Sequence, residues 1–105
     1  MYIEKVQAGE ESQYAIKKDR TEVGRFILSE QGNGVKRLRN LQVDGDVSKT
    51  GILYVFELIQ QYIQKENIQE IQVKSHSKEL DTLLLHQQFE LKDGKEQLWT
   101  YRVNC

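Results

Sequence analysis

Apolar residues along the chain recur at two periods, and the change of period separates predicted strands from predicted helices. In the first half, short apolar runs alternate with polar turns, as in strands that are joined by hairpins. These strand segments are residues 1–7, 14–16, 21–29 and 35–43, with turns at 19–20 and 31–34. From Ile52 to Ile63 apolar residues recur three and four positions apart, which predicts an amphipathic helix.

The second half predicts a strand, a shorter helix and a final pair of strands. The first strand covers residues 68–75, and Ser77 is a typical N-cap for the helix that follows. The apolar stripe of this second helix is Leu80, Leu83 and Leu84. We therefore expect both helices to pack one apolar face against a sheet.

The chain ends in a predicted hairpin. Residues 89–92 form its first strand, and Asp93-Gly94 is a strong signal for a two-residue turn. The predicted order is β-β-β-β-α-β-α-β-β, an α+β fold with a mixed sheet and two helices. The strand–helix–strand unit of residues 38–75 requires a parallel pair and a right-handed crossover.

The strand at residues 21–29 has apolar residues in both phases of its alternation. Val23 and Ile27 fall on one phase, and Phe26 and Leu28 fall on the other. A strand that is apolar on both faces is usually covered on both faces. We therefore expect other elements to cover both sides of this strand.

The strand at residues 35–43 changes phase along its length. Leu38 lies on the even phase, whereas Leu41 and Val43 lie on the odd phase. One extra residue in a β-bulge would bring all three side chains to a common face. The alternative is a regular strand that is buried on both sides.

Composition indicates one soluble domain over residues 1–105. Hydrophobic residues make up 38% of the chain and charged residues 30%, proportions that are typical of globular rather than disordered proteins. The net charge of −1 speaks against a nucleic-acid partner. No apolar run is long enough for a membrane span or a secretory signal. The one cysteine, Cys105, allows no intrachain disulfide and no thiolate metal site, so we expect a cytoplasmic protein.

Four short segments, in this order of elements, carry a family resemblance. They are Glu22-Val23-Gly24, Leu41-Gln42-Val43-Asp44, Gly51-Ile52 and residues 83–89. Over about residues 12–103 the chain resembles the GNAT superfamily of acetyl-CoA-dependent N-acetyltransferases. The resemblance implies a bulged central strand that separates from the next parallel strand, with pantetheine in the gap, and it favours the bulge at residues 38–41.

The resemblance also implies an acetyl-CoA site and a reaction. The acetyl group would pass directly to an amine of a small molecule or peptide, with neither nucleic acid nor membrane as a partner. Amides at a helix N-terminus bind anions, so a loop and helix start would hold the pyrophosphate while a strand edge holds pantetheine. The implied cofactor-binding residues are Leu41, Gln42, Val43, Ser48, Lys49, Thr50, Gly51, Ile52 and Leu53.

The chain departs from the family pattern at several functional positions. Its phosphate loop keeps only the middle glycine, Gly51, and Leu53 stands where a small residue is usual. Leu84 occupies the position of a tyrosine that protonates the departing thiolate, and Arg37 lies near the position of a glutamate base. The catalytic residues therefore stay unassigned. The alternative function is a degenerate GNAT-fold module that binds coenzyme A or a protein partner without catalysis.

Only about seven polar residues separate the first two predicted strands, where family members have two helices that help to shape the acceptor site. The acceptor site would then be open, incomplete or supplied by a second copy in a homodimer.

Other chemically active residues have simpler interpretations. His76 and His86 lack the spacing of a metal pair, and we interpret both as surface residues. Trp99 and Tyr101 alternate on the last strand, which is typical of core rather than of a ligand pocket. Arg37 and Arg39 are explained by paired surface charges as well as by an anion site. Lys49 is either solvated or placed to bind a phosphate.

Overall fold

The computed structural model describes residues 1–103, so Asn104 and Cys105 lie outside it. Within this range the chain forms seven strands and two helices in the predicted order. The strands are β1 (Tyr2–Gln7), β2 (Glu11–Lys18), β3 (Thr21–Gly32), β4 (Val35–Val43), β5 (Glu70–Lys74), β6 (Glu90–Asp93) and β7 (Leu98–Arg102). The helices are α1 (Lys49–Lys65) and α2 (Lys78–His86).

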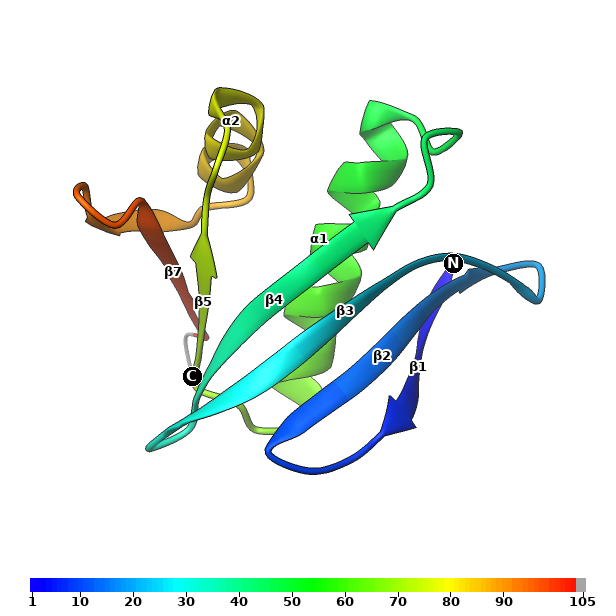
Figure 1. Ribbon diagram of the computed structural model, residues 1–105, viewed down its shortest axis with the longest axis horizontal. Helices are drawn as coiled ribbons and strands as arrows, with labels where there is room; N and C mark the ends of the chain where they lie inside the picture. The colour runs from blue at the N-terminus through cyan, green and yellow to red at the C-terminus, as the bar shows by residue number, and fades with distance from the viewer. Residues whose placement is uncertain (104–105) are drawn as a thin grey trace.

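All seven strands join one mixed sheet in the order β1-β2-β3-β4-β5-β7-β6. The predicted parallel pair is β4–β5, and the other neighbouring strands are antiparallel. Figure 1 shows α1 behind the sheet and α2 at the end of β5, with β4 and β5 diverging toward their arrowheads.

The two early hairpins have the tight turns that the sequence predicts. Asp19 and Arg20 have φ values of 52° and 69°. Asn33 and Gly34 have φ values of 56° and 78°. Two successive residues with positive φ form a turn whose twist matches that of the flanking strands.

The last hairpin differs from its prediction. Its strands pair Asp93 with Leu98, so four residues rather than two make the turn. The Asp93 carboxylate accepts hydrogen bonds from the amides of Lys95 (2.9 Å) and Glu96 (3.4 Å). Gln97, not Gly94, has a positive φ, of 52°. The two-residue turn at Asp93-Gly94 was a wrong prediction because an aspartate side chain can stabilise a longer turn by itself.

Both helices begin at serine caps. The Ser48 hydroxyl accepts the amide of Gly51 at 3.1 Å, and the Ser77 hydroxyl accepts the amide of Leu80 at 3.1 Å. Each bond satisfies one amide that has no partner in the first helical turn. The buried face of α1 consists of Val55, Phe56, Ile59 and Ile63, as the sequence predicts. Leu84 is the buried residue of α2.

Aromatic side chains join the helices to the sheet in one core. Tyr14 and Phe26 stack across β2 and β3 with ring centroids 4.9 Å apart. Phe56 of α1 meets Phe89 edge to face at 6.2 Å. Trp99 is 7% exposed and belongs to the same core, which confirms its interpretation as a core residue. Right-handed crossovers that run in one direction across a sheet put their helices on one face, and this shared core is the result.

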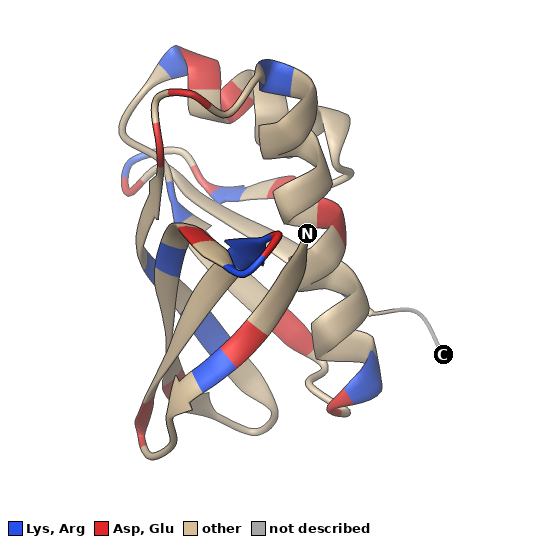
Figure 2. Ribbon diagram, turned by 90° about the vertical axis from the view of Figure 1, so that its right-hand side faces the viewer, with Lys and Arg blue, Asp and Glu red and all other residues tan. Residues whose placement is uncertain are grey.

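The other face of the sheet carries no helix in residues 1–103, and Figure 2 shows α1 on one side of the strands only. Ile27 lies on this uncovered face and is half-buried. Val23 packs against the core instead, because a register shift opposite Ile16 and Lys17 makes it an extra residue of β3. The prediction that both faces of this strand are covered is therefore wrong.

The predicted bulge in β4 is confirmed. Across it β3 advances by two residues between register partners while β4 advances by three. Asn40 lies at this point and has a φ of 53°, a left-handed conformation that asparagine tolerates better than most residues. Leu38, Leu41 and Val43 consequently line the same side of the sheet. A regular strand buried on both sides is excluded.

No helix in the described part of the chain is long and apolar enough to cross a membrane.

Candidate functional site

The main cavity lies where β4 and β5 stop pairing. The two strands pair from Val35 and Glu70 to Leu38 and Val73, and beyond this point they separate. A cavity of about 740 Å³, which we call the β4–β5 cavity, occupies the gap and extends to the two helices. Small-molecule sites commonly have volumes of about 300–1,000 Å³.

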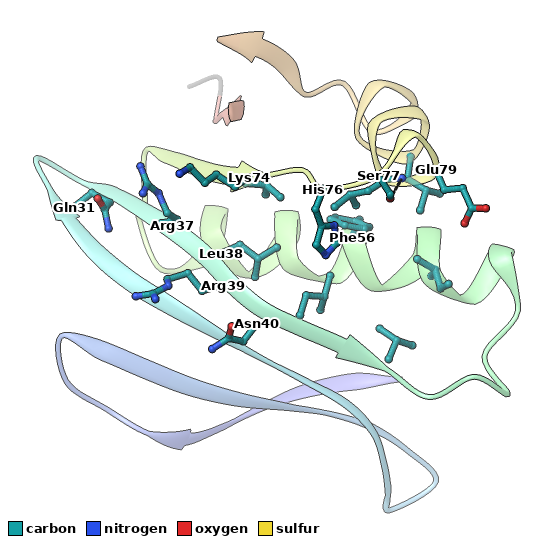
Figure 3. Close-up of a pocket in the computed structure, with 16 residues that line it drawn as sticks. Gln31, Arg37, Leu38, Arg39, Asn40, Phe56, Lys74, His76, Ser77 and Glu79 are labelled. Carbon is teal, nitrogen blue, oxygen red and sulfur yellow. Dashed lines mark hydrogen bonds between the residues drawn. The ribbon is translucent and has the colours of Figure 1, made fainter. Parts of the chain in front are cut away.

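The walls of this cavity combine an apolar side with a polar rim (Figure 3). The apolar lining residues are Leu38, Leu41, Val43, Ile52, Phe56, Val73, Leu80 and Leu83. The polar lining residues are Gln31, Arg37, Arg39, Asn40, Lys74, His76, Ser77 and Glu79. An apolar interior with a few polar groups at its edge is typical of a ligand site.

One wall of the cavity presents unpaired backbone. Asp44 donates its amide to the carbonyl of Val23 on β3 at 2.8 Å. Because successive residues of a strand address opposite edges, Val43 and Leu41 direct their backbone groups away from β3 and toward the gap. Gln42 addresses β3, where it is the register partner of Arg25. The cavity therefore offers the donors and acceptors of an open strand edge.

The N-terminus of α1 offers unpaired amides near the carboxyl end of β4. The carbonyl of Ser48 accepts the amide of Ile52 at 2.9 Å, and its hydroxyl takes that of Gly51. The amides of Lys49 and Thr50 donate to no group within residues 1–103. The first turn holds no acidic residue, so its positive end is not neutralised from within the helix.

Packing against the loop before α1 accounts for the glycine at position 51, without any ligand. A Cβ on Gly51 would lie 2.6 Å from Cγ1 of Val47, closer than real Cβ atoms approach a neighbour. A side chain at position 51 would therefore force Val47 to shift. Close approach of a cofactor is not needed to account for a glycine at this position.

The predicted cofactor-binding residues fall into three groups. Leu41, Val43 and Ile52 line the β4–β5 cavity. Gln42 points to the opposite face of the sheet, where it lines a second hollow of about 370 Å³. The remaining residues, Ser48, Lys49, Thr50, Gly51 and Leu53, form the start of α1 and do not line the cavity. Strand alternation, which turns successive side chains to opposite faces, separates Leu41 and Val43 from Gln42.

The rim at the closed end of the cavity is basic. Arg37 and Arg39 of β4 and Lys74 of β5 all line it. Arg37 donates to the side-chain oxygen of Gln72 at 3.2 Å, and Arg39 pairs with Glu11 at 3.1 Å. For Arg39 the interpretation as a paired surface charge holds, whereas Arg37 has no carboxylate partner within the described residues.

Glu70 lies behind this rim and remains ionised. Burial opposes its negative charge, but hydrogen bonds from Arg102 (2.9 Å) and Gln72 (3.2 Å) and the charge of Lys92 outweigh burial. Together they hold the pKa of Glu70 below its usual range. Glu70 is therefore occupied by partners of its own.

His76 is the functional candidate that sequence reasoning assigned to the surface. It is exposed, but it also lines the cavity, as Phe56 does (Figure 3). Glu79, the acidic lining residue, points away from the other labelled residues. The sequence signal that could have identified His76 is its position between the end of β5 and Ser77, the N-cap of α2. His86, in contrast, does not line the cavity.

Leu83 of α2 faces the cavity, one position before the Leu84 that the family resemblance implies for the tyrosine. Leu84 is fully buried in the core, whereas Leu83 lines the cavity. No tyrosine of residues 1–103 lines it either. The hydroxyl of Tyr62, on α1, lies 3.0 Å from the hydroxyl of Tyr14 and forms a hydrogen bond with it. Its burial and this bond raise the pKa of Tyr62, which makes it a poor proton donor.

The side chains of residues 1–103 form no cluster that is suited to a metal ion. Among residues 1–103 no three His, Cys, Asp or Glu side chains lie close enough together to hold an ion.

Solved structures of acetyltransferases share this architecture. No family model matches the sequence, and no curated protein is similar to it in sequence. The N-acetyltransferase PseH of Campylobacter jejuni, in complex with acetyl coenzyme A, has a TM-score of 0.72 at 9% identity over 92% of this chain and 71% of that one. A GNAT family acetyltransferase of Elizabethkingia anophelis with acetyl-CoA bound gives 0.70 at 14% identity, with coverages of 90% and 77%. A Bacillus subtilis acetyltransferase in complex with CoA gives 0.69 at 13% identity, with coverages of 88% and 78%.

The chain therefore has the GNAT fold, the fold of acetyl-CoA-dependent acetyltransferases. It is shorter than these three proteins, and residues 8–10 alone connect β1 to β2. The resemblance that four short sequence segments indicated is confirmed at the level of fold.

Proposed function

We propose that this chain binds acetyl-CoA in the β4–β5 cavity and transfers the acetyl group to an amine. The observation that carries the proposal is the separation of β4 from β5 directly after the bulge. It places an unpaired strand edge beside an apolar cavity that reaches the first turn of α1. The bound cofactors of the Elizabethkingia anophelis and Bacillus subtilis structures support the same assignment.

The residues present fit acetyl-CoA at two places. The open backbone at Leu41 and Val43 can pair with the two amides of pantetheine, as another strand would. The unpaired amides of Lys49 and Thr50, with the Lys49 ammonium, can hold the pyrophosphate. Gln42 is left out of the proposed contacts because its backbone addresses β3 and its side chain lies on the other face.

We assign His76 as the base. When bound, acetyl-CoA supplies an activated acetyl group, and its transfer yields an amide and free coenzyme A thiol while the amine nitrogen loses one proton. An imidazole can accept this proton near neutral pH. Arg37, Arg39 and Lys74 are cationic and cannot accept it. The backbone at Leu41 and Val43 orients the acyl group, and Phe56 limits access of water.

The proposal is tested first by titration with coenzyme A, monitored by calorimetry and NMR, and then by a turnover assay. We expect coenzyme A to bind, with amide shifts at Leu41, Val43, Lys49 and Thr50. Substitution of His76 by Gln should leave binding unchanged and lower turnover by about 10²-fold, since general base catalysis contributes about 10²–10⁴. Substitution of His86 by Gln, outside the cavity, is the matched control. Absence of binding would contradict the proposal, as would equal turnover in both variants.

The second candidate function is cofactor binding without catalysis. It is favoured by one observation, that Leu80 and Leu83, which line the cavity from α2, are apolar and carry no proton donor. The discriminating variant is Leu83→Tyr, because Leu83 lines the cavity and Leu84 does not. A binding module should show no turnover in the wild type. A gain of turnover in Leu83→Tyr, but not in the core variant Leu84→Tyr, would show that only the donor is missing.

A further inference from the structure

We infer that the acceptor amine carries an anionic group, a carboxylate or a phosphate, which Arg37 binds at the closed end of the β4–β5 cavity. The inference rests on the proposed acetyl transfer and names the class of acceptor, which the transfer by itself leaves open. Three observations carry it: the placement of the cations, the state of their charges and the unpaired polar atoms around Arg37.

The cations surround the point where the strands separate. Arg37 is the register partner of Gln72, one residue before the last pair of β4 and β5. Arg39 and Lys74 follow on the two strands and line the same cavity. Figure 3 shows Arg37, Arg39 and Lys74 at one end of the cavity, with His76 and Phe56 further along it. An amine beside His76 could therefore extend a second group toward Arg37.

Arg37 differs from its two neighbours in its charge balance. Arg39 pairs with Glu11 at 3.1 Å, and Lys74 pairs with Glu96 at 2.9 Å. Arg37 is paired with no carboxylate in the part of the chain that the structure describes. The closed end of the cavity thus keeps one cation whose charge the protein does not balance directly.

Glu70 is the carboxylate linked to Arg37, and it does not balance that charge. The link runs through Gln72, whose oxygen accepts from Arg37 and whose amide donates to Glu70 at 3.2 Å. Arg102 contacts Glu70 at 2.9 Å and Lys92 contacts it at 3.8 Å. Two closer cations therefore already share the one negative charge of Glu70.

Polar atoms next to Arg37 also lack partners. The Nε of Arg37 and the hydroxyl of Ser29, its register partner on β3, are both buried without a hydrogen bond in the described residues. Buried polar groups without partners are rare in folded proteins and cost free energy. A half-buried guanidinium with free donors and no counter-ion is the arrangement that a carboxylate or phosphate completes, through paired hydrogen bonds.

The test compares amines that differ in the anionic group. The probes are 4-aminobutanoate against butylamine, for a carboxylate, and O-phosphoethanolamine against ethanolamine, for a phosphate. Each is titrated by calorimetry into protein saturated with coenzyme A. We expect the anionic member of at least one pair to bind about tenfold more tightly, as one charge-assisted contact allows. The pair that shows the difference identifies the anion.

The variants separate a local contact from overall charge. In Arg37→Gln the preference should disappear. In Lys18→Gln it should persist, because Lys18 is an exposed residue beside the turn between β2 and β3 and does not line the cavity. Thermal unfolding checks that both variants fold. If Arg37→Gln does not fold, Arg37→Lys replaces it, and the preference should weaken because lysine lacks the planar fork.

The outcomes also separate this inference from the proposed function. Failure of coenzyme A to bind would overturn the proposed function, and the inference with it. Binding of coenzyme A with equal affinities for both members of each pair would overturn the inference alone. So would a preference that survives Arg37→Gln, or anionic probes that coenzyme A displaces, because the cation would then serve the cofactor.

Discussion

The two halves of β4 have different neighbours. From Val35 to Leu38 the strand pairs with β3 on one edge and with β5 on the other. Beyond Leu38 it pairs with β3 only, and its second edge faces the β4–β5 cavity. The first half is an ordinary interior strand, whereas the second half is an open edge inside the protein.

The bulge at Asn40 makes this difference compatible with one core. It reverses the alternation, so that Leu41 and Val43 stay on the side of Leu38 while the strand bends away from β5. An open edge normally invites pairing with other chains. Here the edge faces the β4–β5 cavity, which residues of α1 and α2 also line.

The largest expected effect lies in the paired half. Leu38 is 5% exposed, so Leu38→Ala should lower the free energy of unfolding by about 2–3 kcal/mol, the low end for core truncations because one side of Leu38 already faces the cavity. Leu41→Ala, in the open half, should cost about 1 kcal/mol or less, since Leu41 is half-buried. Urea unfolding measures both. Equal losses would mean that the two halves are packed alike.

The bulge itself is tested at Asn40. Asn40→Val places a β-branched residue at a φ of 53° and should cost about 1–2 kcal/mol. Asn40→Gly tolerates this φ and should stay within about 0.5 kcal/mol of wild type. The valine variant should also weaken coenzyme A binding, which calorimetry measures. A neutral valine variant would argue against the bulge.

The ion cluster of Glu70 lies beside the paired half, where Glu70 is the register partner of Val35. Its pKa is lowered in the folded protein from an ordinary 4.5, so its charge stabilises the fold above that value. This stabilisation is lost as the pH falls through the lower folded value. Glu70→Gln should therefore cost about 1.5 kcal/mol at pH 7 and less at acid pH.

Unfolding in urea at several pH values follows this change. The control is Glu4→Gln, which removes an exposed pair with Lys17 at 3.7 Å and should change little. A cost of Glu70→Gln that is the same at pH 7 and pH 3 would show that the charge of Glu70 is not what stabilises the fold.

Variants at Gly51 test whether this glycine serves packing against Val47 or the approach of a ligand to the open half. Gly51→Ala should cost about 1 kcal/mol through the contact with Val47, and the double variant with Val47→Ala should recover most of it. Coenzyme A affinity should recover together with stability. If affinity stayed low in the stable double variant, the ligand itself would need the space at Gly51.

The smallest expected effect concerns charge near the start of α1. Asp46 is exposed and precedes the proposed pyrophosphate site, so Asp46→Asn should raise coenzyme A affinity about twofold at low salt. High salt should reduce the difference. Glu10→Gln, in the exposed turn before β2 and beside Glu30 at the opposite end of the sheet, serves as the control and should bind like the wild type. An equal gain in that control would indicate only a change of overall charge.

Local signals in the sequence predicted most of the fold. The helical stripe from Ile52 to Ile63, the Ser77 cap and the turn at residues 19–20 are all present, and the turn predicted at residues 31–34 forms at 33–34. Each depends on neighbours within a few residues of the chain. The phase change between Leu38 and Leu41 allowed two interpretations, and the family resemblance, not the pattern alone, favoured the bulge.

Tertiary structure decided which residues meet. The sequence could not place His76 and Phe56 in one cavity or separate Leu83 from Leu84 at the cavity wall. It also could not show that Arg37 alone on its rim lacks a carboxylate partner within residues 1–103. Nor could it aim Val23 into the core, because that depends on the register between β2 and β3. Periodicity records the side of an element that is buried. Contacts between residues far apart in the chain depend on register, strand separation and side-chain pairing, which form only when the whole sheet assembles.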